Sequence, residues 1–85
     1  MSQIEIYTQW GCPYCVRAKA LLDAKGVSYT EYDTTMDSSK RAEMVARKPD
    51  ARTVPQIFVD GVPYGGCDDI HALDREGKLD PILGL

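Results

Sequence analysis

The chain has 85 residues, of which 44% are hydrophobic and 27% charged, and its net charge at pH 7 is −3. A chain of this length builds one modest hydrophobic core, so a single domain over residues 1–85 is expected. The acidic balance excludes the basic surface that nucleic-acid binding needs, and no apolar run approaches the ~20 residues of a membrane span.

The cysteines and the first residues bear on the cellular compartment. Three cysteines, an odd number, do not make a secreted disulfide framework. The first five residues contain no basic segment followed by an apolar one, so no secretory signal is expected. These features predict a reducing, cytoplasmic location, in which a disulfide is transient and catalytic.

The first predicted strand, residues 4–7, leads into the sequence Cys12-Pro13-Tyr14-Cys15 and then into a helical pattern. A Cys-x-x-Cys motif at a strand-to-helix junction is typical of thioredoxin-like redox sites. If Cys12 caps the helix, Pro13 takes the first helical position, where its missing N–H costs nothing. Cys15 then lies one turn further along on the same face, at a distance that a disulfide can span.

The place of the motif also predicts which sulfur reacts. The unpaired N–H groups and the positive end of the helix dipole favour an anion in the first turn, and the thiolate is the attacking form of cysteine. Cys12, on the exposed rim, is therefore predicted to be the nucleophile, and Cys15, a turn deeper, the resolving thiol. The alternative is a pair of packed structural cysteines, which seldom have Pro between them at a helix start.

The pattern behind the motif predicts a helix, a strand and a second helix. The first helix ends at Gly26, and its apolar period of 3.6 residues is carried by Val16, Ala20, Leu21 and Ala24. Residues 27–32 alternate apolar and polar side chains, which predicts a half-buried strand parallel to the first. Asp37 then precedes a helix over residues 40–47 in the manner of a capping residue.

The second half of the chain contains two further strands and a helix. Arg47 and Lys48, in the basic loop after the second helix, are interpreted as a solvated face. The remaining predicted elements are a strand over 56–59, a hairpin turn at Asp60-Gly61, a strand over 62–64, a helix over 70–75 opened by Asp68-Asp69, and a final turn over 80–83. Because Pro63 cannot donate to a ladder, the strand over 62–64 is expected at a sheet edge.

This order of elements predicts an α/β domain of the βαβαββα type. Its sheet is expected to be mixed and four-stranded, with helices on both faces. In such domains ligands bind at the carboxyl ends of the parallel strands.

The sequence resembles the glutaredoxins over almost its whole length. The features that carry the resemblance are Cys12-Pro13-Tyr14-Cys15 after the first strand, Thr53-Val54-Pro55 before the third, Gly65-Gly66 after the fourth, and Cys67-Asp68-Asp69 at the next helix. Cys-Pro-Tyr-Cys is the dithiol active-site sequence of that family. The resemblance implies a thioredoxin fold, thiol–disulfide exchange, and glutathione as reducing co-substrate, with no bound cofactor and no metal.

Carried over position by position, the resemblance implies a glutathione site. Val54-Pro55 would be a cis peptide bond facing the thiols, and the main chain of Val54 would pair with the tripeptide. Asp68 would receive the γ-glutamyl end, although helix capping is its alternative role and the expected role of Asp69. Tyr14 would place its ring over the mixed disulfide. The implied glutathione-binding residues are Gln9, Tyr14, Arg52, Thr53, Val54, Pro55, Gly66, Cys67 and Asp68.

Gln9 departs from the family pattern, because many glutaredoxins carry a lysine at this position. A hydrogen bond from a neutral donor is roughly half as strong as one from a charged donor. Weaker glutathione binding, or a smaller thiolate fraction of Cys12, is therefore expected than in a lysine-bearing relative. Arg52 and Arg41 are the candidate cations that would substitute for the lysine.

Parts of the sequence are also compatible with other classes of function. A zinc site is nominally offered by Cys12, Cys15, Cys67 and His71, but its two halves lie further apart than the usual roughly 12–20 residues. An iron–sulfur carrier is a second alternative, against which Pro13 counts, because cluster-binding family members usually have another residue there. Thioredoxin usually has Gly-Pro between its cysteines and a longer chain.

Three further residues near the motifs have open roles. Cys67 is interpreted as a small buried residue at a helix start rather than a regulatory thiol, and His71 as an ordinary surface or core residue. Trp10 either shapes the substrate rim or covers the edge of the core. The expected partners are glutathione and disulfide-containing or glutathionylated proteins, without nucleic acid or membrane, and a monomer is expected.

Overall fold

The computed structural model of the chain describes residues 2–85, and within that range a sheet of four strands is flanked by helices. The strands are β1 (Ile4–Thr8), β2 (Thr30–Asp33), β3 (Gln56–Val59) and β4 (Val62–Gly65). The helices are α1 (Pro13–Ala24), α2 (Ser38–Arg47), α3 (Cys67–Arg75) and the short α4 (Leu79–Ile82). The strand order is β2-β1-β3-β4; β1 is parallel to β2 and antiparallel to β3, and β4 is antiparallel to β3. The expected mixed α/β sheet is confirmed, with α4 in place of a final turn.

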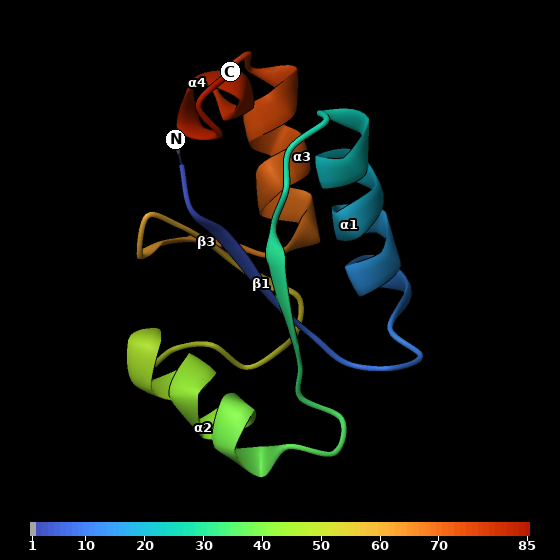
Figure 1. Ribbon diagram of the computed structural model, residues 1–85, viewed down its shortest axis with the longest axis vertical. Coiled ribbons are helices and arrows are strands. Elements are labelled where there is room, and N and C mark those ends of the chain that lie inside the picture. Colours follow the sequence, from blue (N-terminus) through green and yellow to red (C-terminus); the bar gives the residue numbers. More distant parts are fainter. Residues whose placement is uncertain (1) are drawn as a thin grey trace.

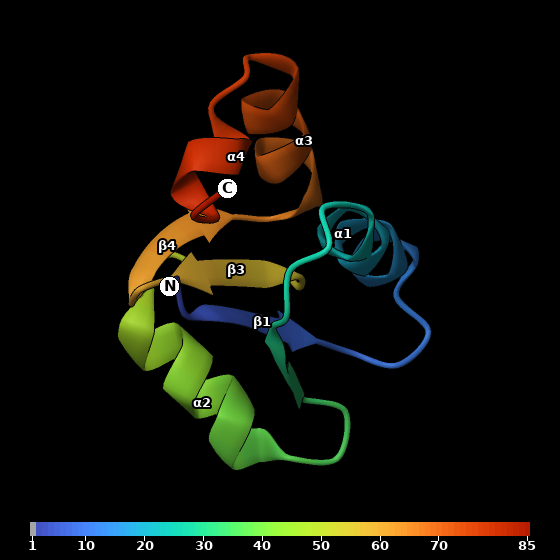
Figure 2. The same cartoon turned by 45° about the horizontal axis from the view of Figure 1, so that its top comes forward.

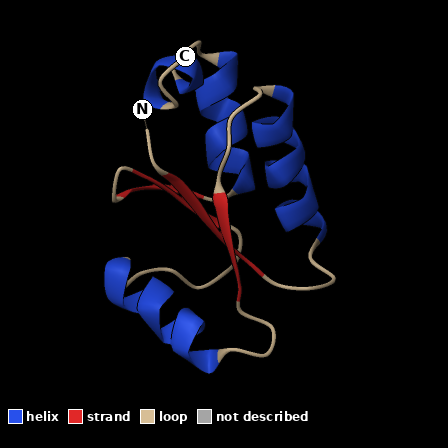
Figure 3. Ribbon diagram, in the orientation of Figure 1, coloured by secondary structure: helices blue, strands red, loops and turns tan. Residues whose placement is uncertain are grey.

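The helices cover opposite faces of the sheet. Figure 1 shows α1 and α3 side by side on one face and α2 alone on the other, and Figure 3 shows the strands between these two groups. The turned view in Figure 2 shows α4 beside α3, and Figure 1 shows α4 next to the start of the chain. The hydroxyl of Ser2 donates to the carbonyl of Ile82 at 3.3 Å, which joins the two ends.

Alternating residues of each strand build two separate cores, because successive side chains of a strand point to opposite faces. In β1, Ile4 and Ile6 face α1 and α3, whereas Glu5 and Tyr7 face α2. On the α1/α3 face the buried cluster consists of Ile4, Ile6, Ala18, Leu22, Ile57, Val59, Cys67, Ile70, Leu79 and Leu83. On the α2 face the buried cluster consists of Tyr7, Met44, Ala51 and Phe58.

The hairpin between β3 and β4 forms as the sequence predicts. Asp60 and Gly61 both have positive φ, 51° and 82°, which is the backbone that a two-residue turn of the type I′ class requires. Pro63 lies on β4, which is an edge strand, so its missing N–H leaves no gap in the interior of the sheet.

The predicted helix α1 is confirmed, but of the apolar residues whose period predicted it, Leu21 alone packs against the core. Val16 is 62% exposed and Ala20 is also exposed, whereas Cys15, Ala18 and Leu22 form the buried side. Two apolar stripes of helical spacing run along this helix, and counting apolar residues cannot choose between them. The stripe that contains Cys15 is buried because that side packs on α3 and the sheet.

The second strand begins later than predicted. Residues 27–29 are not part of β2, and the first pair in the β1–β2 ladder joins Glu5 to Thr30. Val27 and Tyr29 are nevertheless half-buried against the α1/α3 core. In residues 27–29 the alternation of apolar and polar residues therefore reflects which side chains are buried, and not backbone pairing in the sheet.

None of the helices in residues 2–85 combines the length and the apolar character that crossing a membrane would take.

Candidate active site

Cys12 caps the N-terminus of α1, as the sequence predicts. It has an extended backbone (φ −99°, ψ 106°), and Pro13 is the first helical residue. The N–H of Cys15 donates to the Cys12 sulfur at 3.2 Å. The sulfur thus takes the place of the oxygen of an ordinary capping side chain and sits where helix N–H groups and the helix dipole favour negative charge. Cys12 is half-buried and is a free thiol.

Cys15 occupies a different environment one turn along. It is a free thiol that is only 2% exposed. Burial, and then its hydrogen bond with Cys12, raises the pKa of the Cys15 thiol to about 12. At neutral pH Cys15 is therefore protonated, and the partly exposed Cys12 is the thiol that a substrate disulfide can reach.

The loop before β3 faces these thiols. The Val54–Pro55 bond is cis, which the family resemblance implied. The thiol of Cys12 donates to the carbonyl of Val54 at 3.7 Å. The main chain of Val54 therefore lies directly beside the sulfur.

The third side of the site is the N-terminus of α3. Gly66 is its cap residue, and the carboxylate of Asp69 accepts the N–H of Gly66 at 2.9 Å. Gly65 has a φ of 91°, and a β-carbon there would collide with the Asp69 side chain. A β-carbon on Gly66 would lie 3.1 Å from the carbonyl oxygen of Pro55. Glycine at position 65 thus leaves room for the Asp69 carboxylate, and glycine at position 66 lets the start of α3 approach the loop that contains the cis proline.

These three segments enclose an open groove of about 280 Å³, lined by Tyr14, Thr53, Val54, Pro55, Gln56, Gly66, Cys67, Asp68 and Asp69. Most of the residues that the sequence assigned to glutathione line this groove, and Gln9 and Arg52 do not. Gln56 and Asp69 were missed as lining residues. The signal for Gln56 was its position directly after the cis proline at the start of β3, and for Asp69 its position in the first turn of a helix.

The two candidate cations lie close together near the loop before β3. The guanidinium of Arg41 donates to the carbonyl of Arg52 at 3.3 Å, and Arg52 directly precedes Thr53 of the groove. Arg41 is half-buried and Arg52 is exposed. Positive charge is therefore available at this end of the groove, from α2 and from the loop.

Arg47 and Lys48 are not the solvated face that the sequence suggested. Arg47 forms a two-pronged ion pair with Glu5 at 2.9 and 3.1 Å, and Lys48 donates to the side chain of Gln56 at 3.2 Å. Gln56 in turn donates to the carbonyl of Thr53 at 2.9 Å. Lys48 and Gln56 therefore hold the loop before β3, which lines the groove, through this chain of hydrogen bonds.

Cys67 and His71 form a local pair on α3. Cys67 is buried, as predicted, and burial raises the pKa of its thiol. The Nδ1 of His71 lies 2.8 Å from the carbonyl of Cys67, and because a carbonyl only accepts, Nδ1 carries the proton. In residues 2–85 no three His, Cys, Asp or Glu side chains are placed to hold a metal ion, so the alternative zinc ligand set does not come together.

Trp10 does not cover the edge of the core. Its side chain is 83% exposed, on the loop that leads into Cys12. Tyr14 is 52% exposed at the groove, with the guanidinium of Arg17 5.7 Å from the centre of its ring.

Comparison with known proteins gives a consistent result. The family model for glutaredoxins matches residues 4–63. The chain is 54% identical over 83 residues to Glutaredoxin 3 of Escherichia coli K12, covering 98% of this chain and 99% of that protein. It is 51% identical over 83 residues to a glutaredoxin of Pseudomonas aeruginosa, covering 98% of both chains.

Solved structures agree with the sequence relatives. The solution structure of a glutaredoxin from Brucella melitensis is 52% identical and superposes with a TM-score of 0.81, covering 95% of this chain and 87% of that one. The crystal structure of a buckwheat glutaredoxin–glutathione complex is 31% identical, with a TM-score of 0.87, and the match covers 98% of this chain and 77% of that one.

Proposed function

Because the chain belongs to the glutaredoxin family, we propose that Cys12 is its nucleophile, Cys15 its resolving thiol and the groove beside them its glutathione site. Family membership makes the chain a glutathione-dependent thiol–disulfide oxidoreductase with the thioredoxin fold. The observation that carries the division of roles is the contrast between a partly exposed Cys12 at a helix cap and a buried Cys15 whose pKa is raised.

The first half-reaction removes glutathione from a mixed disulfide. The Cys12 thiolate attacks the glutathione sulfur, a Cys12–glutathione disulfide forms, and the substrate leaves as a thiolate that takes up a proton. A second glutathione thiolate then attacks the glutathione sulfur of that disulfide. Oxidised glutathione is released and the Cys12 thiolate is restored, so two electrons pass from glutathione to the substrate.

Protein disulfides use Cys15 as well. Cys12 attacks one substrate sulfur, and Cys15 then attacks the Cys12 sulfur, which releases the second substrate thiolate and closes the internal disulfide. Part of the raised pKa of Cys15 comes from its hydrogen bond with Cys12 and from the charge of Cys12. Once Cys12 is in a mixed disulfide, that part disappears, so Cys15 loses its proton more easily at the stage where it has to attack.

The groove offers complementary groups along the length of a glutathione molecule. The N–H and C=O of Val54 are suited to pair with the cysteinyl peptide, in the way that one strand pairs with another. The start of α3 attracts the γ-glutamyl carboxylate and Asp68 attracts its ammonium. Arg41 and Arg52 supply positive charge on the side of Thr53, where Gln9 carries none. Tyr14, Pro55, Gly66 and Cys67 form the walls.

Turnover of a glutathione mixed disulfide tests the proposal, with glutathione, glutathione reductase and NADPH as the electron supply. We expect Cys12→Ser to have no activity on any substrate, and Cys15→Ser to keep removal of glutathione while losing reduction of protein disulfides. Equal loss in both variants would contradict the assigned roles. We further propose that the protein acts as a monomer in the cytoplasm, on glutathionylated and disulfide-containing proteins.

A further inference from the structure

A second surface, formed where β1 and β2 end rather than by the groove loops next to β3 and β4, combines exposed apolar side chains with carboxylates. Trp10 is 83% exposed and Met36 is 95% exposed, although both are large apolar residues. They line an open depression of about 400 Å³ together with Asp33, Thr35 and Asp37. We name this surface the Trp10–Met36 patch; it shares no lining residue with the groove.

Hydrogen bonds hold the two loops of the patch together. The N–H of Trp10 donates to the hydroxyl of Thr35 at 2.7 Å, and the N–H of Thr35 donates to the carboxylate of Asp33 at 2.8 Å. Thr34, which is buried, donates its hydroxyl to the carbonyl of Thr8 at 2.8 Å. The loop after β2 is thereby tied to the loop before α1, so the patch is pre-organised and costs little entropy to order on binding.

The patch lies within reach of any molecule whose sulfur is bonded to Cys12. Trp10 is two residues before Cys12, so their Cα atoms are less than about 8 Å apart. The residues on either side of a substrate cysteine attached to Cys12 can therefore reach Trp10. A glutathione molecule held in the groove would leave the patch free, because the groove and the patch share no lining residue.

The charges of the patch favour a cationic partner. Hydrogen bonds from Thr35 hold the pKa of the Asp33 carboxyl below its usual range, and those from Ser39 and Lys40 do the same for Asp37. Both carboxylates are exposed and ionised at neutral pH. The charges of Lys19 and Lys40 act on Asp33 and Asp37, but these ammonium groups pair with Glu31 at 3.1 Å and with Glu43 at 3.4 Å and so do not neutralise the patch outright.

We propose that the Trp10–Met36 patch docks the polypeptide of the substrate protein, and that it prefers a segment with an apolar side chain next to Lys or Arg beside the reacting cysteine. A tryptophan and a methionine exposed together provide a large contact area that adapts to different apolar side chains. Two carboxylates at the rim add charge complementarity, which acts mainly on specificity and association rate. The proposal rests on the proposed function, since it assumes that substrate proteins bond to Cys12.

Binding can be measured without any redox reaction, because Trp10 is the only tryptophan of the chain. Its fluorescence should report an exposed ring in the free protein and shift to shorter wavelength when a peptide covers it. We would titrate Cys12→Ser protein with three peptides in which the cysteine is replaced by serine: one with leucine and arginine beside that serine, one with leucine and glutamate, and one with glycine and glutamate. We expect a saturable shift with the first peptide, weakened by salt and weaker still with the other two.

Turnover separates docking from chemistry. On a glutathionylated leucine–arginine peptide, we expect Trp10→Ala to lower kcat/KM about tenfold, as for a central aromatic contact residue. The double variant Asp33→Asn/Asp37→Asn, which keeps the hydrogen-bond acceptors, should lower it roughly threefold at low salt. On the mixed disulfide of glutathione with free cysteine both variants should match the parent protein. Val62→Ala, at another exposed apolar residue, is the matched control and should change neither rate.

The following outcomes would overturn the docking proposal. Equal loss on the peptide and the small substrate would mean that Trp10 supports the active-site loop instead. No fluorescence shift with the leucine–arginine peptide, or equal shifts with all three, would mean that the patch does not select this segment. A protein dimer that Trp10→Ala converts to monomer would assign the patch to a second copy of the chain. Absence of turnover on the small substrate would instead count against the proposed function, and the fluorescence titration would still decide docking.

Discussion

On one face of the sheet, α1 and α3 are held by apolar packing, whereas on the other face α2 is held largely by polar contacts around a small aromatic core. The buried cluster under α1 and α3 is almost entirely aliphatic, with Cys67 as its only sulfur-containing member among the described residues. Under α2, Met44 is the only buried residue of the helix in the described part of the chain. The helix is otherwise held by polar and charged side chains that contact residues of β1 and β2.

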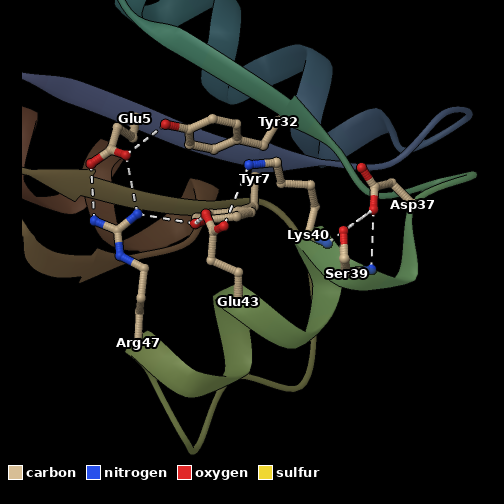
Figure 4. Close-up of polar contacts among 8 residues, drawn as sticks. All are labelled: Glu5, Tyr7, Tyr32, Asp37, Ser39, Lys40, Glu43 and Arg47. Atoms are coloured by element: carbon tan, nitrogen blue, oxygen red, sulfur yellow. Dashed lines mark hydrogen bonds and ion pairs between the residues drawn. The ribbon is translucent and has the colours of Figure 1, made fainter.

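Figure 4 shows these polar contacts of α2. Arg47 makes the ion pair with Glu5 and also donates to the hydroxyl of Tyr7 at 3.0 Å, while its guanidinium lies 4.1 Å from the centre of the Phe58 ring. Glu43 accepts from Tyr7, and Tyr32 donates to Glu5 at 2.8 Å. Burial, and next the hydrogen bond to Glu43, raises the pKa of Tyr7 to about 12, so Tyr7 keeps its proton and donates.

Apart from the positive charge that Arg41 of α2 brings near Thr53, the residues proposed to react or to line the groove are positioned by the apolar face, whereas α2 is mainly attached to the sheet. Cys12 and Cys15 lie at the start of α1, and Gly66 and Cys67 at the start of α3, so the apolar face positions both the thiols and one wall of the groove. Of the groove-lining residues, none comes from α2. Substitutions in the apolar face should therefore change both stability and activity. Substitutions in the polar contacts of α2 should change mainly stability.

The largest effect should come from a cavity in the apolar face. Leu22 of α1 is fully buried, and Leu22→Ala should lower the free energy of unfolding by about 2–5 kcal/mol. This is a large part of the roughly 5–15 kcal/mol available to a small domain. Urea unfolding followed by circular dichroism measures the change, and activity should fall with the folded fraction.

Val16→Ala provides the matched control in the same helix. Val16 is 62% exposed, so its truncation should change the free energy of unfolding by no more than roughly 0.5 kcal/mol. If Leu22→Ala and Val16→Ala lowered the free energy of unfolding equally, the assignment of the buried side of α1 would be wrong.

An intermediate loss of stability is expected when the polar contacts of α2 are removed. Arg47→Met should lower the free energy of unfolding by about 1–3 kcal/mol, because the Glu5 carboxylate loses its charged partner in a mostly buried position. The folded variant should retain the parent kcat/KM on a small glutathione mixed disulfide. Adding Glu5→Gln should recover part of the loss, since the unpaired charge is then gone.

The ion pair between Lys78 and Glu76 is the control for Arg47. Its atoms are 3.8 Å apart and both side chains are about half exposed or more, so Lys78→Met should change stability by roughly 0.5 kcal/mol at most. A loss of activity in Arg47→Met that exceeded its unfolded fraction would contradict the separation of the two faces.

The smallest effect should be a dependence on acid pH. The hydrogen bonds from Arg47 hold the pKa of the Glu5 carboxyl below its ordinary value of 4.5 in the folded protein. The folded state therefore favours the carboxylate, and this stabilisation is complete above about pH 5 and is lost as the pH falls through the folded pKa. The free energy of unfolding should decline more steeply below that pH in the parent protein than in Glu5→Gln, and identical pH profiles would show that Glu5 contributes nothing.

Much of the fold and of the site could be predicted from local patterns. Cys12 and Pro13 at a helix start, the turn at Asp60-Gly61 and the edge position of Pro63 each depend on one or two residues with strict backbone requirements, and all three are confirmed. The cis bond before Pro55 came from family resemblance, because a single sequence does not distinguish cis from trans proline.

What failed depends on contacts between distant parts of the chain. Arg47 was interpreted as a solvated charge because its partner, Glu5 of β1, is far away in the sequence. The residues next to Arg47 do not indicate that this ion pair forms. The buried side of α1 depends on the position of α3, which the periodicity of α1 does not contain. Gln56 was overlooked because its role comes from the loop that it supports and not from its own chemistry.

We expect Cys12, and no other thiol of the chain, to form the covalent bond with glutathione. The most direct measurement is mass spectrometry of intact and digested Cys15→Ser protein after incubation with an equimolar glutathione mixed disulfide. We expect one glutathione per chain, located on Cys12 and removed by added free glutathione. Glutathione on Cys67 instead, or no adduct at all while the protein remains folded, would contradict it.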